Sequence, residues 1–435
     1  MVFPSLKAAV LDAKRCLKCK KPGCQQGCPI SNDIPEFLEA FANGNFGDAR
    51  RIIARKSNLP AVCGRVCAHE LQCQGHCVLN RKGEPIQIGA IEALIADFAF
   101  ELDLPLDQLR QRQQGRVAVI GSGPAGLTVA GDLAKEGFDV TVFEAQEEVG
   151  GVLLYGIPAF RLPKDVVRRE IENIRLLGVE FRTNSVVGKD ITVDQLLEEG
   201  YEAVFIGSGT VIAKDLILPG RDLQGVAQGS YLLRMNYLYR SRQLERKALP
   251  LIEGETVVVI GAGNVAMDTA RTARELGARR VQVVYRRRRE DMPALDAEYE
   301  GALADGVEFC FEANPQAFLG TEGKLSGLLV RRGEGEEVIE ADRAFIAIGS
   351  KPANRIVSST EGIEIDDDGY VMIRERPYGM TSKKAVFAGG DVVHRPATVV
   401  LAMKEAKKVA EGIREYVQNI HYMQMLENLD PQIRS

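Results

Sequence analysis

Short apolar runs of strand length alternate with helical patterns over most of the chain. Val117 to Ile120 and Val140 to Phe143 form a first pair of buried-strand patterns, and residues 256–260 and 281–285 form a second pair. A segment with helical spacing separates the two strands of each pair. Buried strands that alternate with helices are typical of parallel α/β sheets. We therefore expect two α/β folds of the Rossmann type in one chain.

The first 110 residues have a helical period instead. Residues 34–41, 46–54 and 88–98 each place apolar side chains at helical spacing, and Pro60 is expected to end the second of these helices. A polar linker over residues 101–115 follows. We expect residues 1–110 to form a small, mainly helical domain.

A glycine-rich turn follows the first strand. Gly121, Gly123 and Gly126 stand at the G-x-G-x-x-G spacing, with Pro124 and Ala125 between the last two. The first glycine permits a tight strand-to-helix turn, the second lets the backbone approach a pyrophosphate, and the third lets the helix pack closely on the strand. The N–H groups at the start of the helix then hold the phosphate charge. This stretch predicts a dinucleotide site.

The second pair of strands repeats this turn. Gly261 and Gly263 are followed by Asn264 and Val265, and Ala266 takes the place of the third glycine. The fingerprint permits alanine at that position. We therefore expect a second dinucleotide site in the same chain.

The two folds differ in the charge at the end of their second strand. Glu144 ends the first, where a carboxylate can accept hydrogen bonds from ribose hydroxyls. Arg286 and Arg287 follow the second, and guanidinium groups suit a 2′-phosphate. We expect FAD in the first fold and NADP(H) in the second. NAD(H) is the alternative, because Glu290 and Asp291 lie close by.

The first fold is expected to resume after the second. Residues 344–349 form a strand pattern that resembles residues 203–209. Asp391 follows a later strand pattern, and a helix is expected to begin at Thr398. The predicted fold class is α/β, with an NAD(P)H-binding domain at 251–344 inserted into an FAD-binding domain at 111–250 and 345–435.

The cysteines are concentrated near the N-terminus, where eight of nine lie within residues 16–77. Structural zinc would use paired C-x-x-C hooks, and only Cys16 and Cys19 make one. A redox dithiol would lie beside the flavin strand, about a hundred residues further on. A dense run of cysteines ending in Cys-Pro is common in iron–sulfur proteins. We favour iron–sulfur clusters over structural zinc, and zinc over disulfides.

Composition and charge exclude several functional classes of protein. The net charge is −5 and the pI is near 5.7, whereas nucleic-acid binders are usually basic. The apolar runs have strand length, so we expect no transmembrane helix, and residues 1–7 do not resemble a signal peptide. Nine cysteines favour a reducing compartment. We expect a cytoplasmic protein that binds neither nucleic acid nor a membrane.

A set of motifs occurs in order along residues 5–415. They are C-x2-C-x4-C-x3-C-P, the second cysteine group, G-S-G-P-A-G-L, Y-G-I-P-A-F-R-L-P-K, G-A-G-N-V-A-M-D, V-V-Y-R-R, and F-A-G-G-D before A-T-V-V. The set resembles the small (β) subunits of NADPH-dependent glutamate synthases. It also resembles the flavin half of dihydropyrimidine dehydrogenase and the large subunit of NADH-dependent ferredoxin:NADP oxidoreductases.

The resemblance implies FAD, NAD(P)H and two [4Fe–4S] clusters. The implied ligands of one cluster are Cys16, Cys19, Cys24 and Cys77. Those of the other are Cys28, Cys67, Cys73 and the side chain of Glu92, which leaves Cys63 as a bystander.

The resemblance also implies the nucleotide contacts. Besides the residues of the first turn, the flavin contacts are Glu144, Gly151, Arg161, Val187, Asp391 and Thr398. The nicotinamide-nucleotide contacts are Gly261, Gly263, Asn264, Val265, Arg286, Arg287 and Gly349. Two departures from the family pattern, Pro396 and Ala406 in place of glycines, fall near the flavin segment.

The expected function is electron input to a larger, FMN-containing catalytic subunit, with NADPH as the donor. Hydride transfer to a flavin needs no acid or base, so we assign no catalytic residue. Within the family, the alternatives are electron input to a pyrimidine-reducing subunit and electron input in a bifurcating ferredoxin:NADP oxidoreductase. A zinc-containing flavin disulfide reductase and a non-catalytic scaffold are the alternatives of other classes.

Overall fold

The computed structural model describes residues 3–102 and 113–429. Most of the expected linker, and the expected boundary between residues 110 and 111, lie outside this range. The chain forms two compact units, one of residues 1–153, 161–210 and 352–435 and the other of residues 154–160 and 211–351. Within the described ranges, no helix has both the length and the apolarity needed to cross a bilayer.

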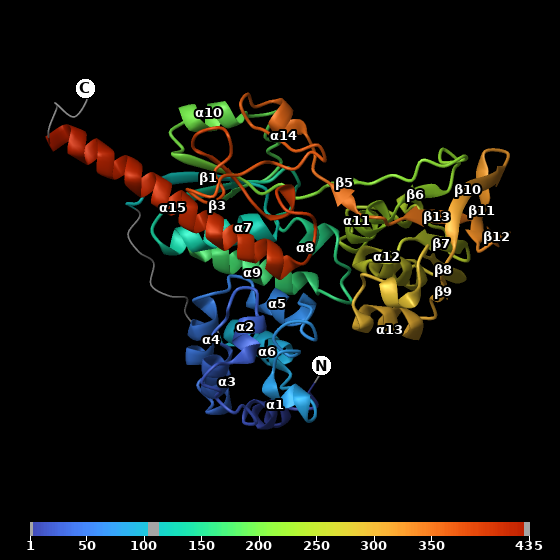
Figure 1. Ribbon diagram of the computed structural model, residues 1–435, viewed down its shortest axis with the longest axis horizontal. Helices are drawn as coiled ribbons and strands as arrows, with labels where there is room; N and C mark the ends of the chain where they lie inside the picture. Colours follow the sequence, from blue (N-terminus) through green and yellow to red (C-terminus); the bar gives the residue numbers. More distant parts are fainter. Residues whose placement is uncertain (1–2, 103–112, 430–435) are drawn as a thin grey trace. The chain divides into compact units, whose positions relative to one another are not determined.

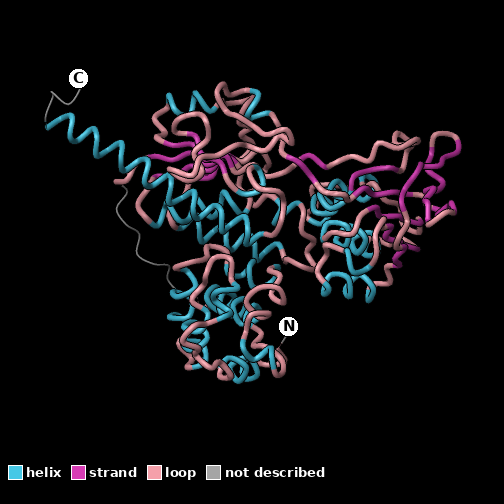
Figure 2. Tube along the Cα trace, in the orientation of Figure 1, coloured by secondary structure: helices cyan, strands magenta, loops and turns pink. Residues whose placement is uncertain are grey.

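The cysteine-bearing segment is helical, and Figure 2 shows helices and loops there without strands. Phe37 and Phe41 are fully buried in its core, and the Phe41 and Phe46 rings meet edge to face with centroids 5.4 Å apart. Pro60 begins a helix rather than ending one, because proline suits the first helical turn. The helices are α1 (Leu6–Ala13), α2 (Gly23–Gly27), α3 (Ile34–Ala42), α4 (Phe46–Ala54), α5 (Pro60–Val66), the 3-10 helix η1 (Val78–Arg81) and α6 (Ile88–Glu101).

The first unit also contains a five-stranded parallel sheet with the strand order β15-β4-β1-β2-β3. Its strands are β1 (Arg116–Ile120), β2 (Asp139–Phe143), β3 (Glu180–Arg182), β4 (Ala203–Ile206) and β15 (Val386–Ala388). The associated helices are α7 (Pro124–Lys135), α9 (Lys164–Leu176), α10 (Val193–Glu198), α14 (Arg355–Ser358), η4 (Gly390–Val392) and α15 (Val399–Leu429). The long helix α15 packs along α7 (Figure 1).

The second unit repeats this plan with the strand order β6-β13-β7-β8-β9. Its strands are β6 (Val226–Gln228), β7 (Thr256–Ile260), β8 (Arg280–Val284), β9 (Glu308–Cys310) and β13 (Arg343–Ile346). Its helices are α11 (Gly229–Arg240), η2 (Arg246–Ala248), α12 (Asn264–Glu275), η3 (Arg289–Asp291) and α13 (Asp296–Ala304). An antiparallel sheet of β10 (Asn314–Thr321), β11 (Lys324–Arg332) and β12 (Gly335–Glu340) adjoins it, and β5 (Ile212–Ala213) pairs with β14 (Ser350–Lys351).

The predicted fold class is confirmed, because the second parallel fold is inserted in the first and both follow the helical segment. Both boundaries of the inserted fold lie elsewhere than expected, because the second unit already includes residues 211–250, with β6 in its sheet. Strand β13 pairs with β7 in the second sheet, and the chain returns to the first unit only at Pro352. The residues of β13 resemble those of β4 because the two strands hold equivalent places, each beside the strand that leads into the glycine turn.

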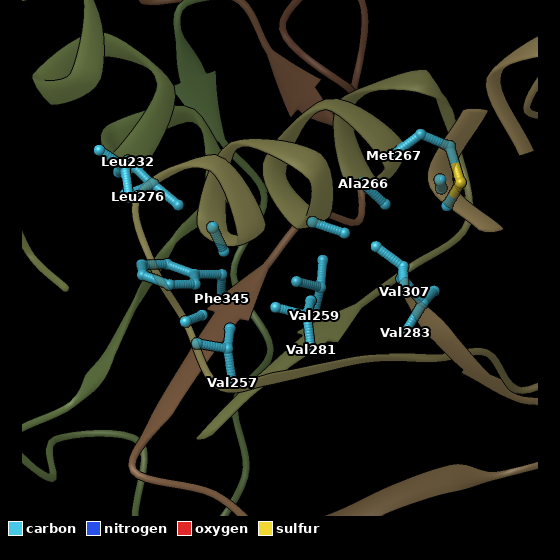
Figure 3. Close-up of a cluster of buried hydrophobic side chains, with 14 of the residues drawn as sticks. Leu232, Val257, Val259, Ala266, Met267, Leu276, Val281, Val283, Val307 and Phe345 are labelled. Carbon is cyan, nitrogen blue, oxygen red and sulfur yellow. The ribbon is translucent and has the colours of Figure 1, made fainter. Parts of the chain in front are cut away.

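The core of the second fold lies between its sheet and α12. Figure 3 shows Val257, Val259 and Val281 on the strands facing Ala266 and Met267 of the helix. All five side chains are completely buried. Burial of a valine or methionine side chain contributes about 1.5–3 kcal/mol. The apolar strand patterns that predicted this fold therefore also account for its core.

A buried polar contact attaches the cysteine-bearing helices to the first fold. The Asn58 amide donates to the Asp132 carboxylate (2.8 Å) and to the Thr128 carbonyl (3.3 Å), both on α7. Lys407 of α15 donates to the other Asp132 oxygen (2.6 Å). A Cβ at Gly131 would lie 2.8 Å from the Asn58 amide, so the missing side chain makes room for this contact.

We predict that Gly131→Ala destabilises the protein although alanine favours helices. Overpacking costs about 1–3 kcal/mol, whereas helix propensity alone would favour alanine by about 1 kcal/mol. Gly47→Ala on α4 is the matched control, because a Cβ there meets nothing within 4 Å. Urea unfolding should show a loss of stability for Gly131→Ala and no loss for Gly47→Ala. A stability gain in both variants would contradict the packing argument.

Candidate functional site

The first glycine turn joins β1 to α7. Gly121 has φ +95°, and a Cβ there would lie 2.8 Å from the Gly207 carbonyl. A Cβ at Gly126 would lie 1.9 Å from the Gly121 carbonyl, so only glycine permits this approach of helix and strand. Gly123 caps α7 and has open space where a Cβ would point. Open space therefore adjoins Gly123 at the start of α7, where a pyrophosphate can approach the backbone.

Glu144 is buried at the end of β2, beside this turn. Its carboxylate accepts from the Ser122 backbone (3.0 Å), the Ser122 hydroxyl (2.5 Å) and the Gln146 backbone (2.8 Å). The Ser122 hydroxyl in turn accepts from the Gly150 backbone (2.9 Å). Gly151 has φ +51°, and a Cβ there would lie 2.9 Å from the Gly123 Cα. The structure therefore brings the predicted residues Glu144 and Gly151 to the first turn.

The Asp391 segment reaches the same turn from the other side. A Cβ at Gly390 would lie 2.7 Å from the Ala125 Cβ, which places Asp391 next to the start of α7. Burial raises the pKa of Asp391 to about 6, opposed by the Ala397 N–H that the carboxylate accepts. Thr398 immediately precedes α15, and its hydroxyl accepts from the Leu401 backbone (3.4 Å).

Two further residues that the resemblance implies as flavin contacts, Val187 and Arg161, lie outside the first turn. Val187 is buried in the core together with Ile120 and Phe143 at the ends of β1 and β2. Arg161 is half-buried in the loop before α9. Between the glycine pair and this loop lies a short helix, α8 (Val152–Tyr155), which the sequence did not predict. The site thus combines an open helix start, a buried carboxylate and a second helix start, and this set of donors and acceptors fits a flavin dinucleotide.

The second turn has the same geometry in the second unit. Gly261 has φ +123°, and a Cβ there would lie 2.3 Å from the Ala347 carbonyl. Gly263 caps α12, and the Asn264 side chain accepts from the Leu295 backbone (3.2 Å). Val265 is exposed in the first turn of α12. Gly349, with φ +106°, follows the equivalent strand β13.

The four arginines after β8 fall into two pairs. Arg288 lies 3.3 Å from Glu312, and Arg289 lies 2.5 Å from Asp296 with its guanidinium over the Tyr299 ring. Arg286 and Arg287 are exposed, and no carboxylate in the described ranges lies within 4.0 Å of either. The pair without partners is the pair that the sequence assigned to the 2′-phosphate, so the geometry leaves both guanidiniums available to a ligand.

Four cysteines surround one cavity in the helical segment. Cys16, Cys19, Cys24 and Cys77 line it together with Leu17, Pro22 and Val78. Burial raises the pKa of Cys24 to about 11, and repulsion from Cys77 adds to the effect. Burial likewise raises the pKa of Cys16. These are the four residues that the family resemblance assigns to one cluster.

The second set gathers around Glu92 on α6. Burial raises the pKa of Cys28 to about 11 and also raises that of Cys73, and repulsion from Glu92 contributes in both cases. A hydrogen bond with Cys63, then burial and repulsion, raise the pKa of Cys67. Burial raises the pKa of Glu92 itself to about 8, with repulsion from Glu170 adding to it. Burial favours the neutral forms of these thiols and of the Glu92 carboxyl, whereas a bound cationic centre would stabilise their thiolate and carboxylate forms.

Asn32 and Ser122 are site residues that the sequence reasoning missed. The Asn32 amide donates to the Glu92 carboxylate (3.3 Å), and Ser122 links Glu144 to Gly150. Ser122 lies inside the G-x-G-x-x-G turn, so its place in the motif could have identified it as a site residue. Asn32 lies 60 residues from Glu92 in the sequence, and no local pattern connects them.

Within the described part of the chain, no three His, Cys, Asp or Glu side chains converge closely enough to hold a single metal ion. A [4Fe–4S] cluster binds each ligand through a different iron, so its ligands surround a volume rather than a point. The arrangement of the four cysteines around the cavity has that form.

Comparison with known families matches both parts of the chain. Residues 3–104 match the family model described as dihydropyrimidine dehydrogenase domain II, 4Fe–4S cluster. Residues 115–406 match the pyridine nucleotide-disulphide oxidoreductase family.

Curated relatives match over nearly the whole chain. The glutamate synthase [NADPH] small chain of Escherichia coli is 36% identical, over 94% of this chain and 92% of its own. The corresponding small chain of Halomonas elongata is 37% identical, over 94% and 91%. A subunit of an NAD-dependent dihydropyrimidine dehydrogenase from Escherichia coli O157:H7 is 32% identical, over 94% of both chains.

Solved structures share the fold. Thioredoxin reductase of T. acidophilum superposes with a TM-score of 0.54 at 19% identity, over 69% of this chain and 97% of its own. Mycobacterium tuberculosis FprA in complex with NADPH gives 0.58 at 19% identity, over 72% and 86%.

The resemblance drawn from the motifs is confirmed by these relatives. The chain joins a 4Fe–4S domain to an FAD- and NAD(P)-binding oxidoreductase domain, and it is an NAD(P)H-dependent flavin oxidoreductase. It belongs to the family of glutamate synthase small chains and their flavin and iron–sulfur relatives.

Proposed function

We propose that the chain is the electron-input subunit of a larger oxidoreductase, with NADPH as donor and a glutamate synthase as the assembly. In one chain, two dinucleotide folds with oppositely charged strand ends are joined to two sets of clustered thiols, and this arrangement supports the proposal. Bound FAD accepts two electrons as hydride from a nicotinamide and releases them singly to iron–sulfur clusters. The relatives named small chains are 36% and 37% identical, which supports this assembly.

The residues of the first fold bind and orient the flavin nucleotide. The N–H groups at the start of α7, opened by Gly121 and Gly123, hold the pyrophosphate. Glu144, already fixed by Ser122, has oxygen lone pairs left for ribose hydroxyls. The free N–H groups and the positive dipole end at the start of α15 would stabilise negative charge on the flavin. Asp391 lies beside the first turn.

The residues of the second fold select the nicotinamide nucleotide. Gly263 leaves the start of α12 open to the pyrophosphate, and Arg286 and Arg287 bind the 2′-phosphate. Arginine without a carboxylate partner can form charge-assisted, bidentate hydrogen bonds with a phosphate. The absence of a competing acid near Arg286 and Arg287 among the described residues favours NADPH over NADH.

The buried thiols hold two [4Fe–4S] clusters in this proposal. Cys16, Cys19, Cys24 and Cys77 bind one, and Cys28, Cys67, Cys73 and Glu92 bind the other. Asn32 keeps the Glu92 side chain in place through its amide. Cys63 stays outside the proposed ligand set, and its sulfur lies 3.6 Å from the Met403 sulfur on α15.

The partner is a larger subunit that carries FMN and the substrate chemistry. The relatives are themselves named as small chains or subunits, which supports a larger partner. The dihydropyrimidine dehydrogenase subunits at 32% and 33% identity make a pyrimidine-reducing partner the second candidate. We place the assembly in the cytoplasm, where nine cysteines stay reduced.

We predict that Arg286→Ala raises the KM for NADPH by at least about tenfold, because a charge-assisted hydrogen bond contributes about 1.5–3 kcal/mol. The KM for NADH should change little. Arg288→Ala is the matched control, because Arg288 already pairs with Glu312. Steady-state kinetics with an artificial acceptor measures all four values. An equal rise for both nucleotides would remove the 2′-phosphate assignment.

We predict about eight irons per chain in the purified protein and about four in Glu92→Ala. The change should remove the spectroscopic signal of one cluster and leave the other. Cys63→Ala, at a buried cysteine outside both ligand sets, should keep about eight irons. Iron analysis and electron paramagnetic resonance of the reduced proteins check this. Zinc in place of iron would support the disulfide-reductase alternative, and two intact signals in Glu92→Ala would overturn its role as a ligand.

A further inference from the structure

The charge of the chain is distributed unevenly. Residues 1–28 contain six Lys or Arg and one Asp, a balance of +5, in a chain whose net charge is −5. The remaining residues therefore carry −10. The basic segment is also the one that contains Cys16, Cys19 and Cys24. A local field of opposite sign to the whole molecule is a feature that partners recognise.

The loop of residues 81–84 lies beside this basic segment. Arg15 donates to the Glu84 carbonyl (2.5 Å), and Asp12 accepts from the Gln87 backbone (2.8 Å). A Cβ at Gly23 would lie 2.5 Å from the His76 carbonyl. Residues 14–23 and 76–87 therefore form one continuous surface, which we call the basic face.

Most cations of the basic face have no carboxylate partner. Lys18 pairs with Glu39, and Arg15 pairs with Asp12. Five others are exposed and have no carboxylate within 4.0 Å in the described ranges: Lys14, Lys20, Lys21, Arg81 and Lys82. Because these cations make no internal ion pair, a partner's carboxylates can meet them without first breaking one.

The basic face also contains exposed apolar side chains. Leu17 is 63% exposed and Val78 is 42% exposed, and both line the cavity of the first four cysteines. Exposed apolar side chains among charged ones are typical of protein interfaces. A protein that docks on this face would therefore lie next to the cavity of the first cysteine set.

We propose that the basic face docks an electron-accepting protein through an acidic surface on that protein. The inference rests on the proposed function and adds the exit point and the charge of the partner. Complementary charge steers the encounter and raises the association rate, most strongly at low ionic strength. Leu17 and Val78 become buried in the complex and bring the acceptor close to the first cysteine set.

The test uses the full-length chain with its cofactors bound, without the larger subunit, and two redox proteins of opposite charge. A plant-type [2Fe–2S] ferredoxin supplies an acidic surface, and cytochrome c supplies a basic one. The first variant is Lys14→Glu/Lys20→Glu/Lys21→Glu, and Arg81→Glu/Lys82→Glu is a second that avoids the residues next to the cysteines. Lys189→Glu/Lys247→Glu/Lys324→Glu is the matched control for the first variant, because these three lysines are exposed elsewhere and the net charge changes by the same amount.

Biolayer interferometry at low and high ionic strength measures binding independently of activity. The wild type should bind ferredoxin at low ionic strength, and both face variants should lose roughly tenfold or more in affinity. The control should retain binding, and the face variants should gain binding to cytochrome c. Equal loss in the control would overturn the proposal. So would anionic vesicles, or a second copy of the chain, binding to the face while ferredoxin does not.

Ferricyanide reduction by NADPH separates this inference from the proposed function. Ferricyanide is small and needs no docking surface, so the face variants should reduce it at the wild-type rate. Normal ferricyanide reduction with unchanged ferredoxin binding overturns the docking inference alone. Failure of the wild type to oxidise NADPH with ferricyanide overturns the proposed function itself.

Discussion

The contact of Asn58 with helix α7 is the constraint on which the arrangement of the first unit depends. The Asp132 carboxylate accepts hydrogen bonds from Asn58 of the helical segment and from Lys407 of α15. Three parts of the chain that are distant in sequence therefore meet at one carboxylate. Glu170 of α9 accepts from the Ala61 backbone (2.5 Å) at the start of α5. Buried polar contacts of this kind are costly to break, because each leaves an unpaired group. These contacts join the helical segment that carries the thiols to the first dinucleotide fold in one compact unit.

Charge at the strand ends distinguishes two folds that are otherwise similar. Glu144 and the arginines after β8 hold equivalent positions. An acid there can accept from ribose hydroxyls, whereas an arginine can bind a phosphate. In the proposed function, this difference in charge lets the same backbone plan bind two different nucleotides. Burial also acts on the thiols: it raises the pKa of Cys24 and of Cys28, and a bound cationic centre would offset that cost.

Local patterns in the sequence predicted both parallel folds, both glycine turns and the helices α3, α4, α6, α7, α12 and α15, because each depends on neighbours in the chain. The pattern could not assign β13 to its sheet, since equivalent strands in two similar folds have similar residues. It also missed that Arg288 and Arg289 are already paired, because Glu312 and Asp296 reach them only in the folded chain. Asn32 and Asn58 were invisible for the same reason: their partners lie 60 and 74 residues away.

The proposed function requires two iron–sulfur clusters in the same unit as the flavin fold. Anomalous X-ray diffraction at the iron edge, on crystals of the purified protein, would locate them. We expect two separate iron peaks, one among Cys16, Cys19, Cys24 and Cys77 and one among Cys28, Cys67, Cys73 and Glu92. A zinc peak at Cys16 and Cys19, or a single iron site, would contradict it.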